Sequence, residues 1–129
     1  MKAADQSSSL NAIFKTTSQK IFIVSSRACG STSISGLEFS AGGRYIDILA
    51  VDAQGSFVVV ELKVSRGYDR VIGQLLRYMS WVEQNMETSK PVRGIIVAKE
   101  ITNDLKLAAS RISGVRLIEY EIEFKLRPV

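Results

Sequence analysis

The chain has 129 residues, 46% of them hydrophobic, and a formal net charge of +4, which suits a single domain with a sizeable core and is compatible with nucleic-acid binding. It contains one cysteine, Cys29, and no histidine, which excludes an intramolecular disulfide, Ser-His-Asp and Cys-His catalysis, and histidine-ligated zinc. The apolar runs are far shorter than a membrane span and the polar start does not resemble a signal peptide, so we expect a cytoplasmic protein without a membrane partner.

The first 36 residues carry the weakest pattern. Residues 10–14 suggest a short helix, residues 20–25 (KIFIVS) a strand, and residues 31–35 a polar connector. A second strand is expected at residues 37–40, followed by a tight turn at Gly42 and Gly43. We therefore expect one domain over residues 1–129, with a poorly defined segment at 1–36 and the motifs in 37–129.

The most informative stretch is GRYIDILAVDAQGSFVVVELKV, residues 43–64. Two apolar, β-branched runs flank DAQGS, which predicts a β-hairpin, and Gly55 suits the left-handed third position of a three-residue loop. This loop sets a register in which Leu49 faces Val59 and Asp47 faces Glu61. The period of two places Lys63 on the same face as the two acids.

Two opposed carboxylates in an apolar strand pair are unfavourable unless a partner neutralises them. Mg²⁺ or Mn²⁺ would be such a partner, because Mg²⁺ prefers oxygen ligands and keeps several waters. A lysine beside the metal can orient a water for attack on phosphorus. The alternative is that Asp47, Glu61 and Lys63 form an ion-pair cluster on a solvated sheet face.

A turn at residues 65–68 precedes a helix expected from residue 70 to about 86, with Asp69 as its N-cap. Gln74 and Tyr78 lie one turn apart and can face one site, although a solvated glutamine and a boundary core tyrosine fit equally. Trp81 shares the polar face with Arg70 and Arg77. It would either stack on a base or lie against the phosphate backbone, or be buried under the N-terminal segment or a partner subunit.

The remaining chain predicts a buried strand at 92–98, a helix at 103–110 capped by Thr102, and a strand at 115–126. A strand, helix and strand in succession imply that the strand at 92–98 runs parallel to the Glu61 strand. Lys99 would follow the end of that strand, where ligands often bind in open α/β sheets. The strand at 115–126 alternates apolar residues with three glutamates, which is typical of a solvated edge.

Together, the runs GRYIDILAVDAQGSFVVVELK, QLLRYMSW and RGIIVAKEI resemble the PD-(D/E)XK nuclease superfamily. The resemblance is to its RecB-like branch and the C-terminal nuclease domain of NucS/EndoMS-type endonucleases, over about residues 37–129. It implies an α/β, restriction-endonuclease-like fold with a central mixed sheet flanked by helices. It also implies that Asp47, Glu61 and the Leu62 carbonyl hold Mg²⁺ or Mn²⁺, that Lys63 is catalytic, and that Gln74 and Tyr78 line the site.

The N-terminus departs from that family pattern. Members usually carry a leading helix with an acidic residue that completes the metal site, whereas this chain offers Asp5 and then Glu38, which lies in an expected strand. Two explanations stay open. Either the domain belongs to a longer chain with an N-terminal domain, or the third acid is dispensable or lost.

The leading hypothesis is a Mg²⁺- or Mn²⁺-dependent DNA endonuclease domain, and a homodimer would suit double-strand cutting. Basic and aromatic side chains would contact the DNA: Arg44, Arg66, Arg70, Arg77, Trp81 and Lys99. The alternative is an inactive nuclease-fold module that binds nucleic acid or mediates assembly. A third interpretation is a structural domain in which the two acids and the lysine are a salt-bridge cluster.

Overall fold

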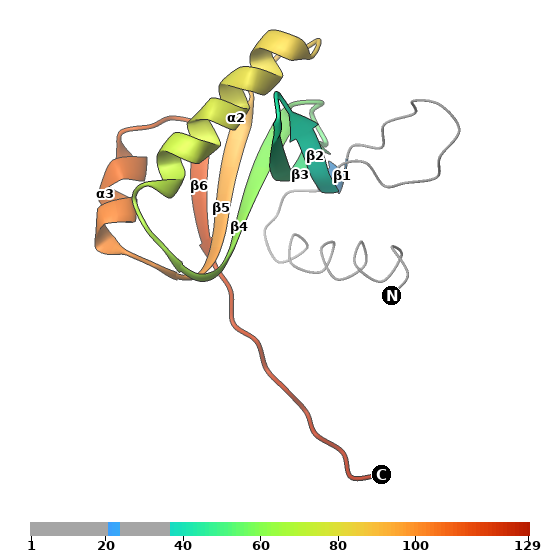
Figure 1. Cartoon of the computed structure of the whole chain (residues 1–129), viewed down its shortest axis with the longest axis vertical. Helices are drawn as coiled ribbons and strands as arrows, with labels where there is room; N and C mark the ends of the chain where they lie inside the picture. Colours follow the sequence, from blue (N-terminus) through green and yellow to red (C-terminus); the bar gives the residue numbers. More distant parts are fainter. Residues whose placement is uncertain (1–20, 24–36) are drawn as a thin grey trace.

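A computed structural model of the chain describes residues 21–23 and 37–129, which form one mixed sheet with helices packed against it (Figure 1). The elements in order are β1 (Ile21–Ile23), β2 (Leu37–Ala41), β3 (Arg44–Asp52), β4 (Phe57–Gly67), α2 (Val71–Asn85), β5 (Arg93–Ile101), α3 (Asn103–Ser110) and β6 (Val115–Glu119). The α/β fold with a central mixed sheet is thus confirmed. The expected helix at 10–14, the connector at 31–35, Asp5 and Cys29 lie outside the described residues.

The sheet has six strands in the order β1-β3-β4-β5-β6, and β2 also pairs with β3. Strand β3 is antiparallel to β1, β2 and β4, whereas β4, β5 and β6 are parallel to one another. The parallel pairing of β4 with β5 follows from the intervening helix α2, as the strand, helix and strand succession predicts. Strand β4 therefore lies at the centre, between an antiparallel and a parallel neighbour.

The hairpin between β3 and β4 forms as expected. Gly55 has a φ of 86° and its N–H donates to the Asp52 carbonyl at 3.0 Å. The Asp52 carboxylate accepts the N–H groups of Gln54 and Ser56, both at 2.9 Å, and pairs with Arg93 of β5 at 2.5 Å. Burial alone would raise the pKa of Asp52, but these donors outweigh it and lower the pKa. The turn is thereby tied to the neighbouring parallel strand.

Apolar side chains cover both faces of the sheet. Residues of α2 and α3 pack with Leu49 and Val59 on one face, while Ile48 and Val60 belong to a separate cluster on the other. Ile46 breaks the alternation, because it belongs with Leu49 to the cluster on the helix side. The break lies at Asp47, beside the last paired residues of β3 and β4, Ile48 and Val60.

Several expected boundaries were wrong. Residues 65–67 are not a turn but continue β4, and α2 begins at Val71 with Arg70 as an N-cap that has no side-chain hydrogen bond, so Asp69 does not cap the helix. Lys99 lies inside β5 rather than after its end. The helix α3 and its Thr102 cap are as predicted, with the Thr102 side chain accepting the Leu105 N–H.

The last strand is shorter than expected. It ends at Glu119 rather than at residue 126, although Tyr120 still donates its N–H to the Ala98 carbonyl at 3.1 Å. A strand needs a partner as well as an alternating pattern, and the described part of the chain supplies none beyond Tyr120. Within the described residues, neither helix has the length and apolar character needed to cross a bilayer.

The close contact between α2 and β5 generates a prediction about stability. A Cβ added at Gly94 would lie 2.7 Å from the Met79 sulfur and 2.8 Å from a Leu75 methyl, so Gly94→Ala forces the helix away from the sheet. We expect a loss of about 1–3 kcal/mol in the free energy of unfolding, measured by urea denaturation.

Gly73, which lies in α2, is the control glycine. A Cβ there meets nothing within 4 Å, so Gly73→Ala should stabilise the helix by about 0.5–1 kcal/mol. A Gly94→Ala variant that is as stable as the wild-type chain would show that the helix is not seated on β5 in this way.

Candidate active site

Asp47 lies where β3 and β4 stop pairing. The alternating pattern of the hairpin would direct the Leu62 N–H to the Ile46 carbonyl. Instead, the Leu62 N–H donates to the Asp47 Oδ2 at 2.7 Å. A carboxylate thus replaces a backbone acceptor in the ladder, which fixes the Asp47 side chain against β4 while leaving it partly exposed.

Glu61 is the most unusual group in the sheet. It is 1% exposed and follows three fully buried valines of β4, Val58, Val59 and Val60. Its Oε1 accepts a hydrogen bond from the Lys63 ammonium at 2.9 Å. Its Oε2 is buried with no hydrogen-bond partner, and among the described residues it is the one buried side-chain oxygen or nitrogen in that state.

Burial is the largest influence on the Glu61 carboxyl and raises its pKa. The charge of Asp47 acts in the same direction, whereas the hydrogen bond and charge of Lys63 lower the pKa, and the net shift is upward. The sequence-based register is confirmed as far as Ile48 and Val60, and the effect of the Asp47 charge on the Glu61 pKa indicates that the two acids lie near each other.

Oxygen donors in this arrangement fit a divalent cation. Asp47 and Glu61 offer two carboxylates, and the orphaned Glu61 Oε2 lacks a positive or donating partner. Within residues 21–23 and 37–129, no third acid, histidine or cysteine gathers with them. Glu38 is exposed on β2 with a φ of 48°, so it does not join the pair.

A basic hollow of about 660 Å³ lies beside the acid pair. Its wall includes four cationic side chains and no acidic one among the described residues, and its lining is Lys63, Ser65, Arg66, Tyr68, Arg70, Val71, Gly73, Gln74 and Arg77. Lys63 is common to the hollow and to the acid pair, because it contacts Glu61 and also lines the wall. We call this cavity the basic hollow.

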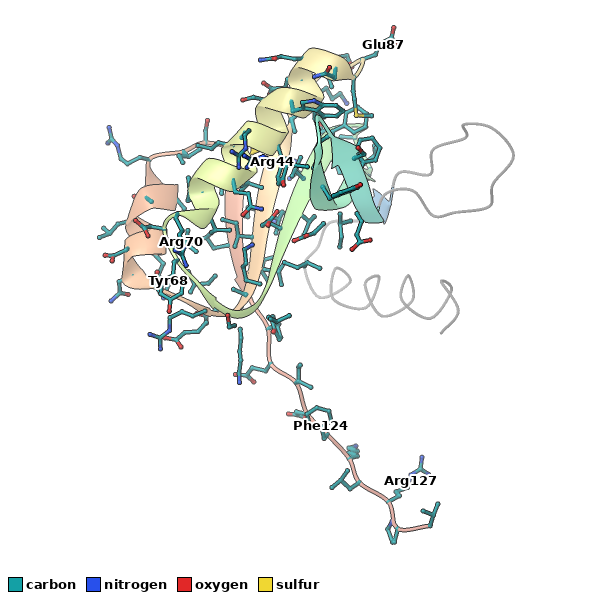
Figure 2. All side chains as sticks on the ribbon, in the orientation of Figure 1. Arg44, Tyr68, Arg70, Glu87, Phe124 and Arg127 are labelled. Carbon is teal, nitrogen blue, oxygen red and sulfur yellow. The ribbon has the colours of Figure 1, made fainter. Side chains whose placement is uncertain are left out.

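Strand β4 and helix α2 shape the basic hollow. The pairing of β4 with β5 shifts register between Lys63 and Arg66. Such an irregularity changes the direction in which the nearby side chains point. The Arg70 guanidinium lies 5.6 Å from the centre of the half-exposed Tyr68 ring; both are labelled in Figure 2. Arg66 forms an exposed ion pair with Glu100 at 2.9 Å, and exposed ion pairs contribute little to stability.

The two helix residues expected at the site differ in position. Gln74 lines the basic hollow, as expected from its place on the polar face. Tyr78 is 4% exposed, belongs to the core on the helix side, and is not part of the lining, although Arg77 lies 6.0 Å from its ring centre. A direct role for Tyr78 at the site stays a prediction.

Three expected DNA contacts lie away from the basic hollow. Trp81 packs edge-on against Phe39 with ring centres 6.3 Å apart, and its indole nitrogen lies 3.0 Å from where a Gly42 Cβ would be. Trp81 therefore supports the hairpin of β2 and β3. Arg44 is exposed at the start of β3 and Lys99 is exposed on β5, and neither lines the hollow; their contact with DNA stays a prediction.

Sequence reasoning did not single out Ser65 or Tyr68, which both line the basic hollow. These positions fell in a predicted turn, where a side chain has no assigned direction. No local pattern in the sequence indicates that these two side chains face the hollow.

Comparison with known proteins identifies related sequences. A family model for the endonuclease NucS C-terminal domain matches residues 30–125. Endonuclease NucS of Parafrankia sp. is 37% identical over 92 residues, which cover 70% of this chain and 41% of the relative. Endonuclease NucS of Methanopyrus kandleri is 35% identical over 96 residues, covering 73% and 33%. The chain thus spans less than half the length of these relatives.

Solved structures share the fold. The EndoMS complex with double-stranded DNA matches with a TM-score of 0.67 and 21% identity, over 93% of this chain and 45% of that one. A repair endonuclease from Pyrococcus abyssi matches with a TM-score of 0.61 and 21% identity, over 94% and 48%. At this level of identity the likeness concerns the arrangement of the sheet and helices.

The raised pKa of Glu61 predicts how one substitution changes stability with pH. The protonated carboxyl is favoured in the folded state, so its contribution to stability is present below the ordinary value of 4.5 and is lost as pH rises through the raised pKa. Glu61→Gln keeps the neutral form at every pH. We expect it to raise the free energy of unfolding at pH 7, with the gain shrinking as pH falls toward 4, measured by denaturation in EDTA.

Glu87→Gln is the control, because this glutamate is exposed beyond the end of α2 (Figure 2), and this substitution should leave the free energy of unfolding at pH 7 unchanged. If Glu61→Gln is less stable than the wild-type chain at pH 7, the ion pair with Lys63 outweighs the burial of the charge.

Proposed function

Because the chain belongs to the family of the endonuclease NucS C-terminal domain, we propose that it is a Mg²⁺- or Mn²⁺-dependent DNA endonuclease domain that hydrolyses phosphodiester bonds. The observation that carries the proposal is the buried Glu61 Oε2, which has no partner and lies beside a second carboxylate and a lysine. Burying a charged oxygen in this way is unfavourable. A site that holds a cation explains it.

Asp47 and Glu61 would hold the cation, with the Leu62 carbonyl as a further oxygen donor next to Glu61. The Leu62 N–H already binds Asp47, which orients one ligand against the strand that carries the other. When bound, the cation would polarise the scissile phosphate and lower the pKa of a water molecule.

Lys63 is the residue that connects this chemistry to the substrate. Its ammonium lies 2.9 Å from the Glu61 carboxylate, and its side chain is about one-third exposed in the wall of the basic hollow. If a bound cation neutralises the Glu61 charge, the Lys63 ammonium can rotate toward an attacking water or toward the phosphate oxygens. There it would stabilise the negative charge that develops on the phosphate.

The basic hollow would receive the DNA backbone. Arg66, Arg70 and Arg77 offer positive charge, and Gln74 adds an amide that can donate to phosphate or base. Two carboxylates on their own would repel a polyanion, so cations placed directly beside them favour binding. Tyr78 would act from the core by supporting Arg77, which lies over its ring.

A second candidate function follows from the size of the acidic cluster. Within the described residues the acids at the site are a pair, without a third member. A nuclease fold that lacks a complete metal site would bind DNA through the basic hollow and not cut it. Such a module would show salt-sensitive affinity and no cleavage with any divalent ion.

Cleavage of duplex and branched DNA with Mn²⁺ tests the proposal. We expect Asp47→Asn and Lys63→Ala each to reduce the cleavage rate by about 100-fold or more, since each removes a participant in water activation. DNA affinity, measured by fluorescence anisotropy, should change far less for Asp47→Asn.

Glu87→Gln removes a carboxylate outside the site and should cleave at the wild-type rate. If the wild-type chain binds DNA and cuts none of these substrates with Mg²⁺ or Mn²⁺, the binding module is the correct function. Cleavage that survives Asp47→Asn unchanged would contradict the proposed site.

A further inference from the structure

The C-terminal segment, residues 121–127, leaves the body of the domain. Tyr120 is its last attachment, with its N–H bound to the Ala98 carbonyl and its hydroxyl donating to the Val64 carbonyl at 2.9 Å. Beyond this point the chain runs outward in an extended conformation, with Phe124 and Arg127 along it (Figures 1 and 2).

This segment exposes large apolar side chains at alternate positions. Ile122, Phe124 and Leu126 are 64%, 82% and 93% exposed. An extended chain with one apolar face and unpaired backbone groups is a template for another strand. It continues directly from β6, which is at the edge of the sheet among the described strands.

The charges between these apolar residues reverse sign at Phe124. Glu121 and Glu123 precede it, and Lys125 and Arg127 follow it. When two copies lie antiparallel with Phe124 facing Phe124, each Glu123 meets a Lys125 and each Glu121 meets an Arg127. The same register places Ile122 opposite Leu126 on the apolar face. The segment is therefore complementary to itself.

Other antiparallel registers that keep the apolar residues on one face have fewer opposite-charge pairs and also oppose like charges. Moving the centre to position 123 opposes two copies of Glu123, and moving it to position 125 opposes two copies of Lys125. A parallel, in-register pair opposes every charge to its own kind. Like charges that face each other across strands are unfavourable, whereas opposite charges and apolar pairs are favourable.

We propose that the C-terminal segments of two copies of this chain pair as antiparallel strands centred on Phe124 and join the chains into a symmetric dimer. Pairing ends at Arg127, because Pro128 has no N–H to donate. Such an interface is isologous, as in most protein dimers. It does not depend on the proposed endonuclease activity.

Two charge variants of the full chain test the proposal by sedimentation velocity at low ionic strength. Lys125→Glu with Arg127→Glu makes the segment acidic throughout, and Glu121→Lys with Glu123→Lys makes it basic throughout. The paired surface is small, so the wild-type chain should dimerise in the micromolar to millimolar range. Each variant alone should be monomeric at those concentrations, and an equimolar mixture of the two should dimerise.

Circular dichroism melting checks that the variants keep the fold, which substitutions in so exposed a segment should not disturb. The proposal is overturned if the wild-type chain stays monomeric throughout this range. It is also overturned if either variant dimerises like the wild-type chain, or if the mixture of variants stays monomeric.

Disulfide cross-linking tests the register. In a Cys29→Ser background, Phe124→Cys places the new thiols of two copies opposite each other, whereas Ile122→Cys faces Leu126. Under mild oxidation, Phe124→Cys should form the linked dimer about tenfold faster than Ile122→Cys, because disulfides demand close Cβ atoms. Equal rates would contradict pairing centred on Phe124.

Discussion

The burial of the Glu61 carboxylate is the constraint on which the candidate site depends. The apolar strand that carries it fixes the position of the charge, and the hydrogen bond from Lys63 satisfies one of its two oxygens. Asp47 meets the same strand where the backbone pairing of the hairpin ends, and binds the Leu62 N–H instead of leaving it to a carbonyl. The backbone pairing of β3 and β4 therefore ends where Asp47 and Glu61 approach each other.

The acid pair, Asp47 and Glu61, lies beside the cations of the basic hollow. The acids project from the sheet, whereas the cations of the basic hollow come from the end of β4 and the exposed side of α2. Lys63 belongs to both sites, because its ammonium binds Glu61 and its side chain lines the basic hollow. A cation between the acids and a phosphate in the hollow would each reduce the repulsion that the other meets, so binding of metal and DNA is expected to be mutually favourable.

Features that short-range chemistry determines could be predicted from the sequence. The Gly55 loop and the Thr102 cap each depend on a few neighbouring residues, and the loop in turn fixed the register of the hairpin. Features that depend on a distant partner could not. The alternating residues after Glu119 have no neighbouring strand among the described residues, and the depth of Tyr78 depends on how α2 sits on the sheet. The register shift after Lys63 directs Ser65 and Tyr68 into the hollow, which no local pattern indicates.

Calorimetric titration of Mn²⁺ into the chain, with and without duplex DNA, most directly tests whether Asp47 and Glu61 form a metal site. We expect saturable binding that is lost in both Asp47→Asn and Glu61→Gln, and tighter binding when DNA is present. Lack of binding by the wild-type chain under both conditions would contradict the metal site, as would equal binding by either variant.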